Sequence, residues 1–210
     1  MDNNILLIGG GGHCKAVIDI IELTNEYNII GILDLKKNIG GTVFGYKILG
    51  SDDDMHKYRS LATYAFVTTG SGGSCLLRKK LFDKLLSIGY KIPNIISPTA
   101  YVSKHVELGI GNIIMHHSLI NANVKILNNN IFNSKSLIEH DSTVGSHNYI
   151  STSANINGMV NIGENCYIGS SSVINQTLKV SDNIIIGSGA VIVKDCIEEG
   201  VYVGIPAKKI

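Results

Sequence analysis

The second half of this chain repeats every six residues, and this period constrains the fold more than any other feature of the sequence. From Val102 to Ile192 every sixth residue is aliphatic or phenylalanine, and no insertion interrupts the series. An α-helix repeats every 3.6 residues and a β-strand every two, so neither element produces this pattern. An isoleucine-rich β-sandwich would not stay in phase over so many steps.

A prism-shaped coil explains a period of six. Each turn of such a coil contains three short strands, and each strand points one aliphatic residue inward before a corner. The residue after the aliphatic one is Gly or Asn at nine of sixteen steps. Both types tolerate left-handed backbone conformations, so we expect them to form the corners. The residue four positions after the aliphatic one is mostly small. The sequence therefore predicts an all-β parallel β-helix of hexapeptide repeats.

The first half of the chain alternates between strands and helices instead. Strands are predicted at residues 5–8, 29–33 and 64–68, and helices with one apolar face at 14–23 and 76–88. The stretch GSDDD, residues 50–54, offers an N-cap and an acidic first turn for a short helix. This alternation predicts a Rossmann-like α/β domain with a small parallel sheet. We expect two domains, residues 1–97 and 98–210, of which the second ends in a C-terminal tail.

Composition narrows the classes of function. The 210 residues carry a formal net charge of +1 without a basic or acidic run, so neither nucleic acid nor an anionic membrane is an expected partner. No stretch approaches the roughly 20 apolar residues of a membrane span, and the N-terminal MDNN lacks the charged start of a secretion signal. The four cysteines are scattered, which favours free thiols in a cytoplasmic protein. No cluster has metal-site spacing, so no metal is expected.

Four consecutive glycines, residues 9–12, separate the first strand from the first helix in LLIGGGGHCKAVIDI. Cys14 stands where the dinucleotide fingerprint has its third glycine, so the match to that motif is incomplete. Unobstructed N–H groups at the start of a helix still suit a phosphate. His13 adds a donor at the mouth of this loop, and Asp34 ends the second strand, where a carboxylate accepts hydrogen bonds from a ribose or a base. The alternative is a tight turn without a ligand.

Together, several segments resemble one family over essentially the whole chain: the bacterial hexapeptide-repeat sugar acetyltransferases with an N-terminal nucleotide-binding-like domain. The resemblance rests on GGGGHCKAVIDI, GILD, GYKILGSDDD, NSKSLIEHD, NIGENCYIGSSSVI and GVYVGIPAKKI, in that order. The family includes N-acetyltransferases of nucleotide-linked 4-amino sugars and sialic acid O-acetyltransferases. The resemblance implies a left-handed β-helix, a homotrimer with sites between neighbouring chains, acetyl-CoA as co-substrate and a nucleotide-linked amino sugar as substrate.

The segment SLIEHD matches the family's catalytic segment, which implies that His140 is the general base and Asp141 its carboxylate partner. Acetyl transfer to an amine or hydroxyl removes one proton from the nucleophile, and a neutral imidazole accepts it near pH 7. The carboxylate fixes the tautomer and stabilises the imidazolium. Many family members carry Glu at this position, so the shorter Asp141 is a departure from the pattern.

The period of six also places His140 beneath Gly158, because three hexads complete one coil and adjacent coils lie about 4.8 Å apart. A residue without a side chain above the base leaves room for a thioester. Gly158 matches the family glycine that contacts the thioester of acetyl-CoA. We expect its N–H to stabilise the developing oxyanion, an effect worth about 3 kcal/mol in well-studied cases.

The resemblance assigns further residues to the two ligands. Asn133 matches a polar residue near the acceptor sugar, and Tyr149 stands where many members have a histidine beside acetyl-CoA. The residues assigned to the coenzyme are Gly158, Tyr149, Gly187, Pro206 and Lys208. The residues assigned to the nucleotide sugar are Gly10, Gly11, Gly12, His13, Asp34, Gly70 and Asn133.

Three functions are compatible with the sequence. The first is an acetyl-CoA-dependent N-acetyltransferase of a nucleotide-linked 4-amino sugar in bacterial surface glycan biosynthesis, which the N-terminal domain favours because it offers the nucleotide a place to bind. The second is a sialic acid O-acetyltransferase, which NSKSLIEH and GSSSVIN also resemble. The third is a non-enzymatic β-helix assembly protein, against which the pair His140 and Gly158 argues.

Overall fold

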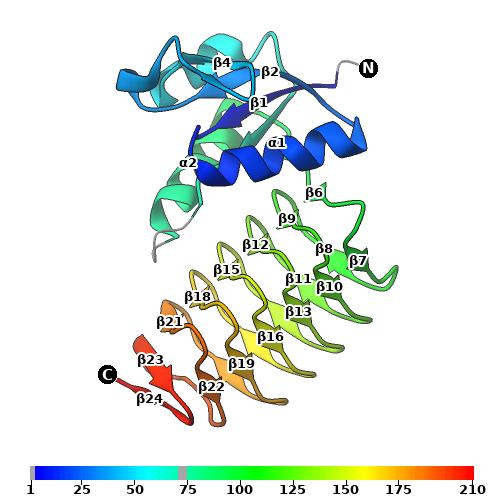
Figure 1. Cartoon of the computed structure of the whole chain (residues 1–210), viewed down its shortest axis with the longest axis vertical. Helices are drawn as coiled ribbons and strands as arrows, with labels where there is room; N and C mark the ends of the chain where they lie inside the picture. Colours follow the sequence, from blue (N-terminus) through cyan, green and yellow to red (C-terminus); the bar gives the residue numbers. More distant parts are fainter. Residues whose placement is uncertain (1–2, 71–74) are drawn as a thin grey trace. The chain divides into compact units, whose positions relative to one another are not determined.

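A computed structural model describes residues 3–70 and 75–210, which form two compact units (Figure 1). The first unit contains residues 3–70 and 77–98. The second contains residues 75, 76 and 99–210. We describe each unit by itself.

A five-stranded sheet in the order β3-β4-β2-β1-β5 forms the centre of the first unit. Its strands are β1 (Asn4–Ile8), β2 (Asn28–Leu33), β3 (Thr42–Val43), β4 (Tyr46–Gly50) and β5 (Tyr64–Val67). Strand β1 pairs in parallel with β2 and β5, β2 pairs in parallel with β4, and β3 runs antiparallel to β4. The side chains of β1 are buried from Ile5 to Ile8, as expected for an inner parallel strand that is covered on both faces.

Helices occupy the connections of this sheet. Helix α1 (Gly12–Thr24) follows β1, and α2 (Leu76–Ile88) follows β5. Two 3₁₀ helices, η1 (Lys36–Asn38) and η2 (Asp52–Tyr58), and the short strand β6 (Ile95–Ile96) complete the unit. A capping box between Ser51 and Asp54 starts η2, which confirms the expected N-cap. The predicted α/β fold is confirmed, and the hairpin of β3 and β4 adds two strands that the sequence did not indicate.

The second unit is a left-handed β-helix whose coils are visible as stacked loops from green to red in Figure 1. Parallel strands of neighbouring coils pair with an offset of 18 residues, as Leu119 pairs with Leu137 and Ile120 with Ile138. This offset equals three hexads. The predicted period of six is therefore confirmed as the spacing between successive strands.

Three parallel sheets form the faces of the prism. The first contains β7 (Tyr101–Val102), β10 (Leu119–Ile120), β13 (Leu137–Ile138), β16 (Asn155–Ile156), β19 (Val173–Ile174) and β22 (Val191–Ile192). The second contains β8 (Glu107–Leu108), β11 (Lys125–Ile126), β14 (Thr143–Val144), β17 (Asn161–Ile162) and β20 (Lys179–Val180). Within the second unit, the third is formed by β9 (Ile113–Ile114), β12 (Ile131–Phe132), β15 (Tyr149–Ile150), β18 (Tyr167–Ile168), β21 (Ile184–Ile186), β23 (Gly200–Gly204) and the antiparallel β24 (Ala207–Lys209).

The aliphatic series of the sequence forms the core of this unit. Every member from Ile114 to Ile192 is at most 3 % exposed. Burying one such side chain contributes about 1.5–3 kcal/mol relative to leaving it in water. The column of aliphatic residues therefore accounts for most of the driving force for stacking the coils.

The corners differ from the prediction in one respect. The left-handed residues stand three positions after the inward aliphatic residue, not one. They are Gly111, His117, Asn123, Asn129, Lys135, Asp141, His147, Ser153, Met159, Asn165, Ser171, Thr177, Asn183 and Gly189. Glycines at the first position serve close packing between coils instead. A Cβ on Gly145 would lie 2.5 Å from the carbonyl oxygen of Gly163, and one on Gly169 would lie 2.5 Å from the amide nitrogen of Ser188.

Candidate active site

His140 and Asp141 lie together at the corner between β13 and β14. Nδ1 of His140 is 2.7 Å from Oδ2 of Asp141, and the two side chains are 53 % and 46 % exposed. Asp141 has a φ of 61°, and in this left-handed conformation the shorter carboxylate reaches the ring of the preceding residue. Because an ionised carboxylate only accepts hydrogen bonds, Nδ1 of the neutral imidazole carries the proton and Nε2 holds the free lone pair. The pair can therefore accept a proton at Nε2.

Asparagines of the preceding coil hold the acidic side chains that flank His140. Asn123 donates from Nδ2 to Oδ1 of Asp141 at 2.7 Å. Asn121 donates in the same way to Oε2 of Glu139 at 2.8 Å, and that oxygen also accepts from the backbone N–H of His140 at 3.3 Å. The hydrogen bonds from Asn123 and then His140 lower the pKa of Asp141 from its ordinary value, because both stabilise its charged form.

Gly158 lies directly over the imidazole. A Cβ at this position would be 3.0 Å from both Cε1 and Nε2 of His140. Any side chain here would therefore collide with the ring or displace it. The absence of a side chain at Gly158 lets the imidazole lie close to its backbone.

The backbone N–H of Gly158 has no acceptor among the described residues, which is also true of Thr152, Ser170 and Gln176 at the same position of other corners but not of two earlier corners. The N–H of Ala122 donates to the side chain of Asn121 at 2.7 Å, and that of Ser134 donates to the side chain of Asn133 at 2.8 Å. Gly158 donates no such hydrogen bond within the ranges that the structure describes. A donor without an acceptor, beside a basic nitrogen, suits a ligand oxygen that gains negative charge.

Asn133 and Tyr149 contact each other on neighbouring coils. Nδ2 of Asn133 donates to the hydroxyl of Tyr149 at 2.9 Å. The ring of Tyr149 stacks on that of Tyr167, with centroids 5.2 Å apart. The family histidine is therefore replaced by a phenol that is held from both sides and presents its oxygen next to an amide.

The residues assigned to the coenzyme near the C-terminus belong to the last coils. The N–H of Gly187 already donates to the carbonyl of Tyr202 at 2.8 Å, and a Cβ on Gly187 would meet Val203 at 2.7 Å. Gly187 thus has a packing role beneath β23. Pro206 follows a cis peptide bond in the turn between β23 and β24, and Lys208 is exposed on β24.

The glycine loop lines two pockets of the first unit. Gly9 has a φ of 110°, and a Cβ on it would meet Thr69 at 2.6 Å. A Cβ on Gly10 would lie 2.9 Å from Oδ2 of Asp34, so this glycine allows the carboxylate to approach the loop. Gly11 and Gly12 face open space.

The two pockets differ in charge. One, of about 270 Å³, contains Asp34, Gly70 and the apolar side chains of Leu77 and Leu81, together with Asp52. Burial raises the pKa of Asp52. The carboxylates of Asp34 and Asp52 accept hydrogen bonds, so this pocket suits a ring with N–H or O–H donors. Sequence reasoning did not assign Asp52 to a ligand, although its segment GSDDD had been singled out as a cap.

The other pocket, of about 470 Å³, shares Gly10 and Asp34 and adds Lys15 and Lys37. Lysine side chains beside a glycine turn at a helix N-terminus suit a phosphate. Asn38 donates to Oδ2 of Asp34 at 2.6 Å. The sequence analysis left these lysines without a role because paired surface lysines are usually solvated.

His13 lies in the first turn of α1, and its side chain is partly exposed. Its Nε2 is buried and has no hydrogen-bond partner in the described part of the chain. Burial, assisted by the Arg78 guanidinium, lowers the pKa of His13 to about 3. The imidazole is therefore neutral, and His13 lies next to Gly70, on which a Cβ would be 3.4 Å from the Cβ of His13.

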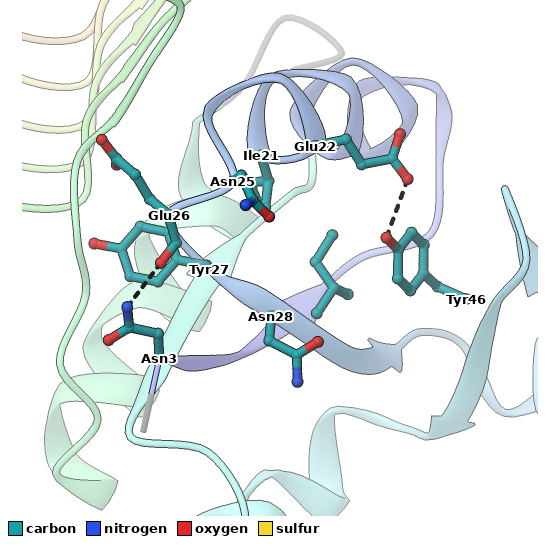
Figure 2. Close-up of a pocket in the computed structure, with 9 residues that line it drawn as sticks. Asn3, Ile21, Glu22, Asn25, Glu26, Tyr27, Asn28 and Tyr46 are labelled. Carbon is teal, nitrogen blue, oxygen red and sulfur yellow. Dashed lines mark hydrogen bonds between the residues drawn. The ribbon is translucent and has the colours of Figure 1, made fainter. Parts of the chain in front are cut away.

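A third pocket, shown in Figure 2, lies where α1 ends and β2 begins. Tyr46 donates to Glu22 at 3.0 Å, and Asn3 donates to the backbone of Glu26 at 3.0 Å.

The described residues include no group of three or more His, Cys, Asp or Glu side chains able to hold a metal ion. Over the same ranges, no helix combines the length and the apolar character that crossing a membrane requires.

The chain matches known proteins in both units. Residues 4–85 match the family model of the PglD N-terminal domain. PerB from Caulobacter crescentus, solved in complex with CoA and GDP-perosamine, has a TM-score of 0.92 and 29 % identity, and the match covers 99 % of this chain and 97 % of that one. The acetyltransferase domain of PglB from Neisseria gonorrhoeae has a TM-score of 0.90 and 27 % identity over the whole of both chains. It was also solved with acetyl coenzyme A.

The family model and these structures confirm the resemblance to the hexapeptide-repeat sugar acetyltransferases. A curated relative, the uncharacterized protein L142 of Acanthamoeba polyphaga mimivirus, is 37 % identical over 107 residues, or 51 % of this chain. The chain spans 20 % of the length of that relative.

Proposed function

We propose that this chain is an acetyl-CoA-dependent N-acetyltransferase that acts on the 4-amino group of a nucleotide-linked amino sugar in bacterial surface glycan biosynthesis. The arrangement of His140, held by Asp141 beneath the bare backbone of Gly158, carries the proposal. The likeness to PerB, which was solved with CoA and GDP-perosamine, supports the co-substrate and the class of sugar.

The chemistry assigns one role to each of these residues. The sugar amine attacks the thioester carbonyl of acetyl-CoA, the C–S bond breaks, and the CoA thiolate leaves and takes the proton back from the imidazolium. Nε2 of His140 takes the proton that the sugar amine loses, and Asp141 stabilises the imidazolium that results. The N–H of Gly158 donates to the carbonyl oxygen of the acyl group as charge develops there. A cradle that a Cβ would fill, and a free N–H beside it, fit this role.

We assign the nucleotide of the substrate to the first unit. The pocket with Lys15 and Lys37 suits its phosphates, and the pocket with Asp34 and Asp52 suits the ribose or the base. Gly10 belongs to both pockets and connects them. This division of charge supports a nucleotide more than a free acidic sugar, because phosphates suit the lysines of one pocket and the donors of a ribose or a base suit the carboxylates of the other.

We also propose a homotrimer. The outward residues of the sheet from β7 to β22 are apolar with one exception, and Tyr101 and Leu119 at its start are 59 % and 36 % exposed. The outward residues of the sheet from β8 to β20 are polar: Glu107, Lys125, Thr143, Asn161 and Lys179. A flat apolar face beside a charged one supports burial of the apolar face between copies of the chain.

A thiol-release assay tests the proposed activity. Acetyl-CoA is supplied with UDP-, dTDP- and GDP-linked 4-amino sugars and, separately, with free sialic acid. We expect release of free CoA with at least one nucleotide-linked amino sugar and no release with sialic acid. Turnover of sialic acid alone would replace this function with O-acetylation, and no turnover with any acceptor would favour a non-enzymatic assembly protein.

A further inference from the structure

The carboxylate of Asp141 is held at both oxygens. Oδ2 accepts from Nδ1 of His140 at 2.7 Å, and Oδ1 accepts from Nδ2 of Asn123 at 2.7 Å. Asn123 and Asp141 are both left-handed corner residues, with φ values of 60° and 61°. The stacking of coils therefore places the amide directly next to the carboxylate.

The exposure of this pair makes the second hydrogen bond important. The side chain of Asp141 is 46 % exposed and that of His140 53 %. A hydrogen bond between two exposed side chains gains little free energy and does not hold them in one geometry, because water competes and the side chains lose entropy when ordered. Burial does not fix the ring in this open site. A neighbour that restrains the carboxylate must supply the restraint.

We propose that Asn123 is a positioning residue that fixes Asp141 and, through it, the tautomer and the orientation of His140. This role rests on the proposed function of His140 as the base. Because the amide nitrogen can only donate, its hydrogen bond keeps Oδ1 an acceptor and leaves Oδ2 for Nδ1 of the ring. Nε2 then remains the basic nitrogen and stays beneath Gly158. The direction of the Asp141 pKa agrees with this, since the bond from Asn123 is the largest cause of its lowering.

A second carboxylate near His140 shows why such restraint is useful. Glu139 is the other titratable group next to this residue, and its Oε2 accepts from the backbone N–H of His140 at 3.3 Å. Asn121 holds that same oxygen at 2.8 Å. Asn121 thus holds Glu139 where it accepts from the backbone N–H of His140, and Asn123 holds Asp141 where it accepts from the ring.

The same type of bond occurs elsewhere with no histidine to orient, which provides a matched control. Asn165 donates from Nδ2 to Oδ1 of Asn183 at 2.7 Å, and both are left-handed corner residues one coil apart. If bonds between corners serve only to join the coils, removal of Asn123 and removal of Asn165 have the same consequences. If Asn123 positions Asp141, only its removal changes His140.

The experiment compares Asn123→Gly with Asn165→Gly, because glycine removes the amide and accepts the left-handed backbone. Both variants should keep the melting temperature and the oligomeric mass of the parent. Nitrogen-15 NMR of labelled histidine reports the tautomer, and the His140→Ala variant identifies the resonance. We expect neutral His140 to be protonated mainly at Nδ1 in the parent and in Asn165→Gly, and to become a mixture of tautomers in Asn123→Gly.

Kinetics with the acceptor that the thiol-release assay identifies supply the second measurement. We expect Asn123→Gly to lower kcat about 10-fold, the lower end of what partners behind a metal-bound histidine contribute, with an unchanged KM for acetyl-CoA. In the Asp141→Asn background, the added Asn123→Gly should change kcat less than about twofold, because a residue that acts through Asp141 has nothing left to position. Additive losses would overturn the proposal.

The two measurements separate this inference from the proposed function. An unchanged tautomer in Asn123→Gly overturns the positioning role even if the chain transfers acetyl groups. A shifted tautomer confined to that variant supports the role even if no sugar in the panel is a substrate, because the NMR measurement requires no turnover.

Discussion

At the scale of single residues, the direction of one hydrogen bond decides what His140 can do. Asp141 accepts from Nδ1, so the basic lone pair belongs to Nε2, the ring nitrogen that lies close to Gly158. In the proposal, the hydrogen bond from Asn123 to Asp141 restrains this pair. The residues that bracket the base are therefore an aspartate from its own corner, an asparagine from the coil before and a glycine from the coil after.

We predict that His140→Ala lowers kcat by about 10²–10⁴-fold, the usual contribution of a general base. The KM for acetyl-CoA should change little, because the variant removes no group that we assign to holding the coenzyme. Asp141→Asn should lower kcat less, since it perturbs the base without removing it. Steady-state kinetics with a nucleotide-linked amino sugar measure both, and near-normal turnover of the alanine variant would mean that another group accepts the proton.

Gly11 is suited to a test of the nucleotide pocket. Its φ is −76° and a Cβ there meets nothing within 4 Å, so valine strains neither the backbone nor the packing. A branched side chain at this place would project into the space that the nucleotide needs. We predict that Gly11→Val raises the KM for the nucleotide sugar strongly and leaves kcat at saturating sugar nearly unchanged, as expected for lost ground-state binding.

The matched control for this variant is Gly12→Ala. Gly12 was expected to contact the nucleotide sugar but lines neither pocket, and the added methyl group faces open space at the start of α1. Both variants should melt like the parent. If a well-folded Gly11→Val has an unchanged KM, and neither UMP, TMP nor GMP competes with the sugar, the glycines are only a turn.

His13 makes the stability of the chain depend on pH. Its pKa is lowered from 6.5 to about 3 in the folded chain, so between these values the unfolded chain binds a proton that the folded chain does not. The free energy of unfolding therefore falls as pH decreases from about 6.5, by up to about 1.4 kcal/mol per pH unit from this group. Urea unfolding at pH 4.5, 5.5 and 6.5 should give a shallower dependence for His13→Gln than for the parent. Equal slopes would contradict the buried, neutral state.

At the scale of elements, a ladder of asparagines joins four coils of the β-helix from inside. Oδ1 of Asn112 accepts from the backbone N–H of Asn130 at 2.9 Å, and Oδ1 of Asn130 accepts from that of Asn148 at 2.8 Å. Oδ1 of Asn148 accepts from the N–H of Cys166 at 2.7 Å. All three asparagines are at most 1 % exposed. They occupy the fourth position after the aliphatic residue, where the sequence otherwise has small side chains.

We predict that Asn130→Ala lowers the free energy of unfolding by about 1–3 kcal/mol, because it leaves the buried backbone N–H of Asn148 without its acceptor. Asn161→Ala is the control, since Asn161 is exposed and accepts only from the hydroxyl of Thr143 at 2.7 Å. This second substitution should stay within about 0.5 kcal/mol of the parent. Urea unfolding of both compares them. If the asparagine ladder contributes nothing to stability, the two variants will have the same free energy of unfolding.

At the scale of the whole molecule, the proposed assembly rests on the contrast between an apolar and a polar face of the β-helix. The proposed trimer buries the apolar face that begins with Tyr101 and Leu119. A carboxylate in the middle of such an interface loses its hydration without gaining a partner. We predict that Leu119→Glu shifts the trimer to monomer in light scattering, whereas Lys179→Glu on the polar face leaves the mass unchanged. A parent that is already monomeric and fully active would rule out the shared sites.

The sequence by itself determined the elements and the register of this chain. A period of six over sixteen steps allows only a coil of three short strands, and hydrogen bonds between coils hold residues 18 apart in register. For that reason the stacking of His140 under Gly158 followed from residue numbers alone, and so did the buried column from Ile114 to Ile192. The strand, glycine turn and helix of the first unit followed equally from local patterns.

Only the tertiary structure decided which side chains meet. The left-handed corner lies at Asn123 and Asp141 rather than at the Gly and Asn positions two residues earlier, because close approach between coils, not backbone freedom, selects small residues there. The hydrogen bond from Asn123 to Asp141 depends on the direction in which each corner points its side chain. The burial of His13 and the opposite charges of the two pockets depend on the packing of segments distant in the sequence. A period records spacing along the chain and carries no information on these directions.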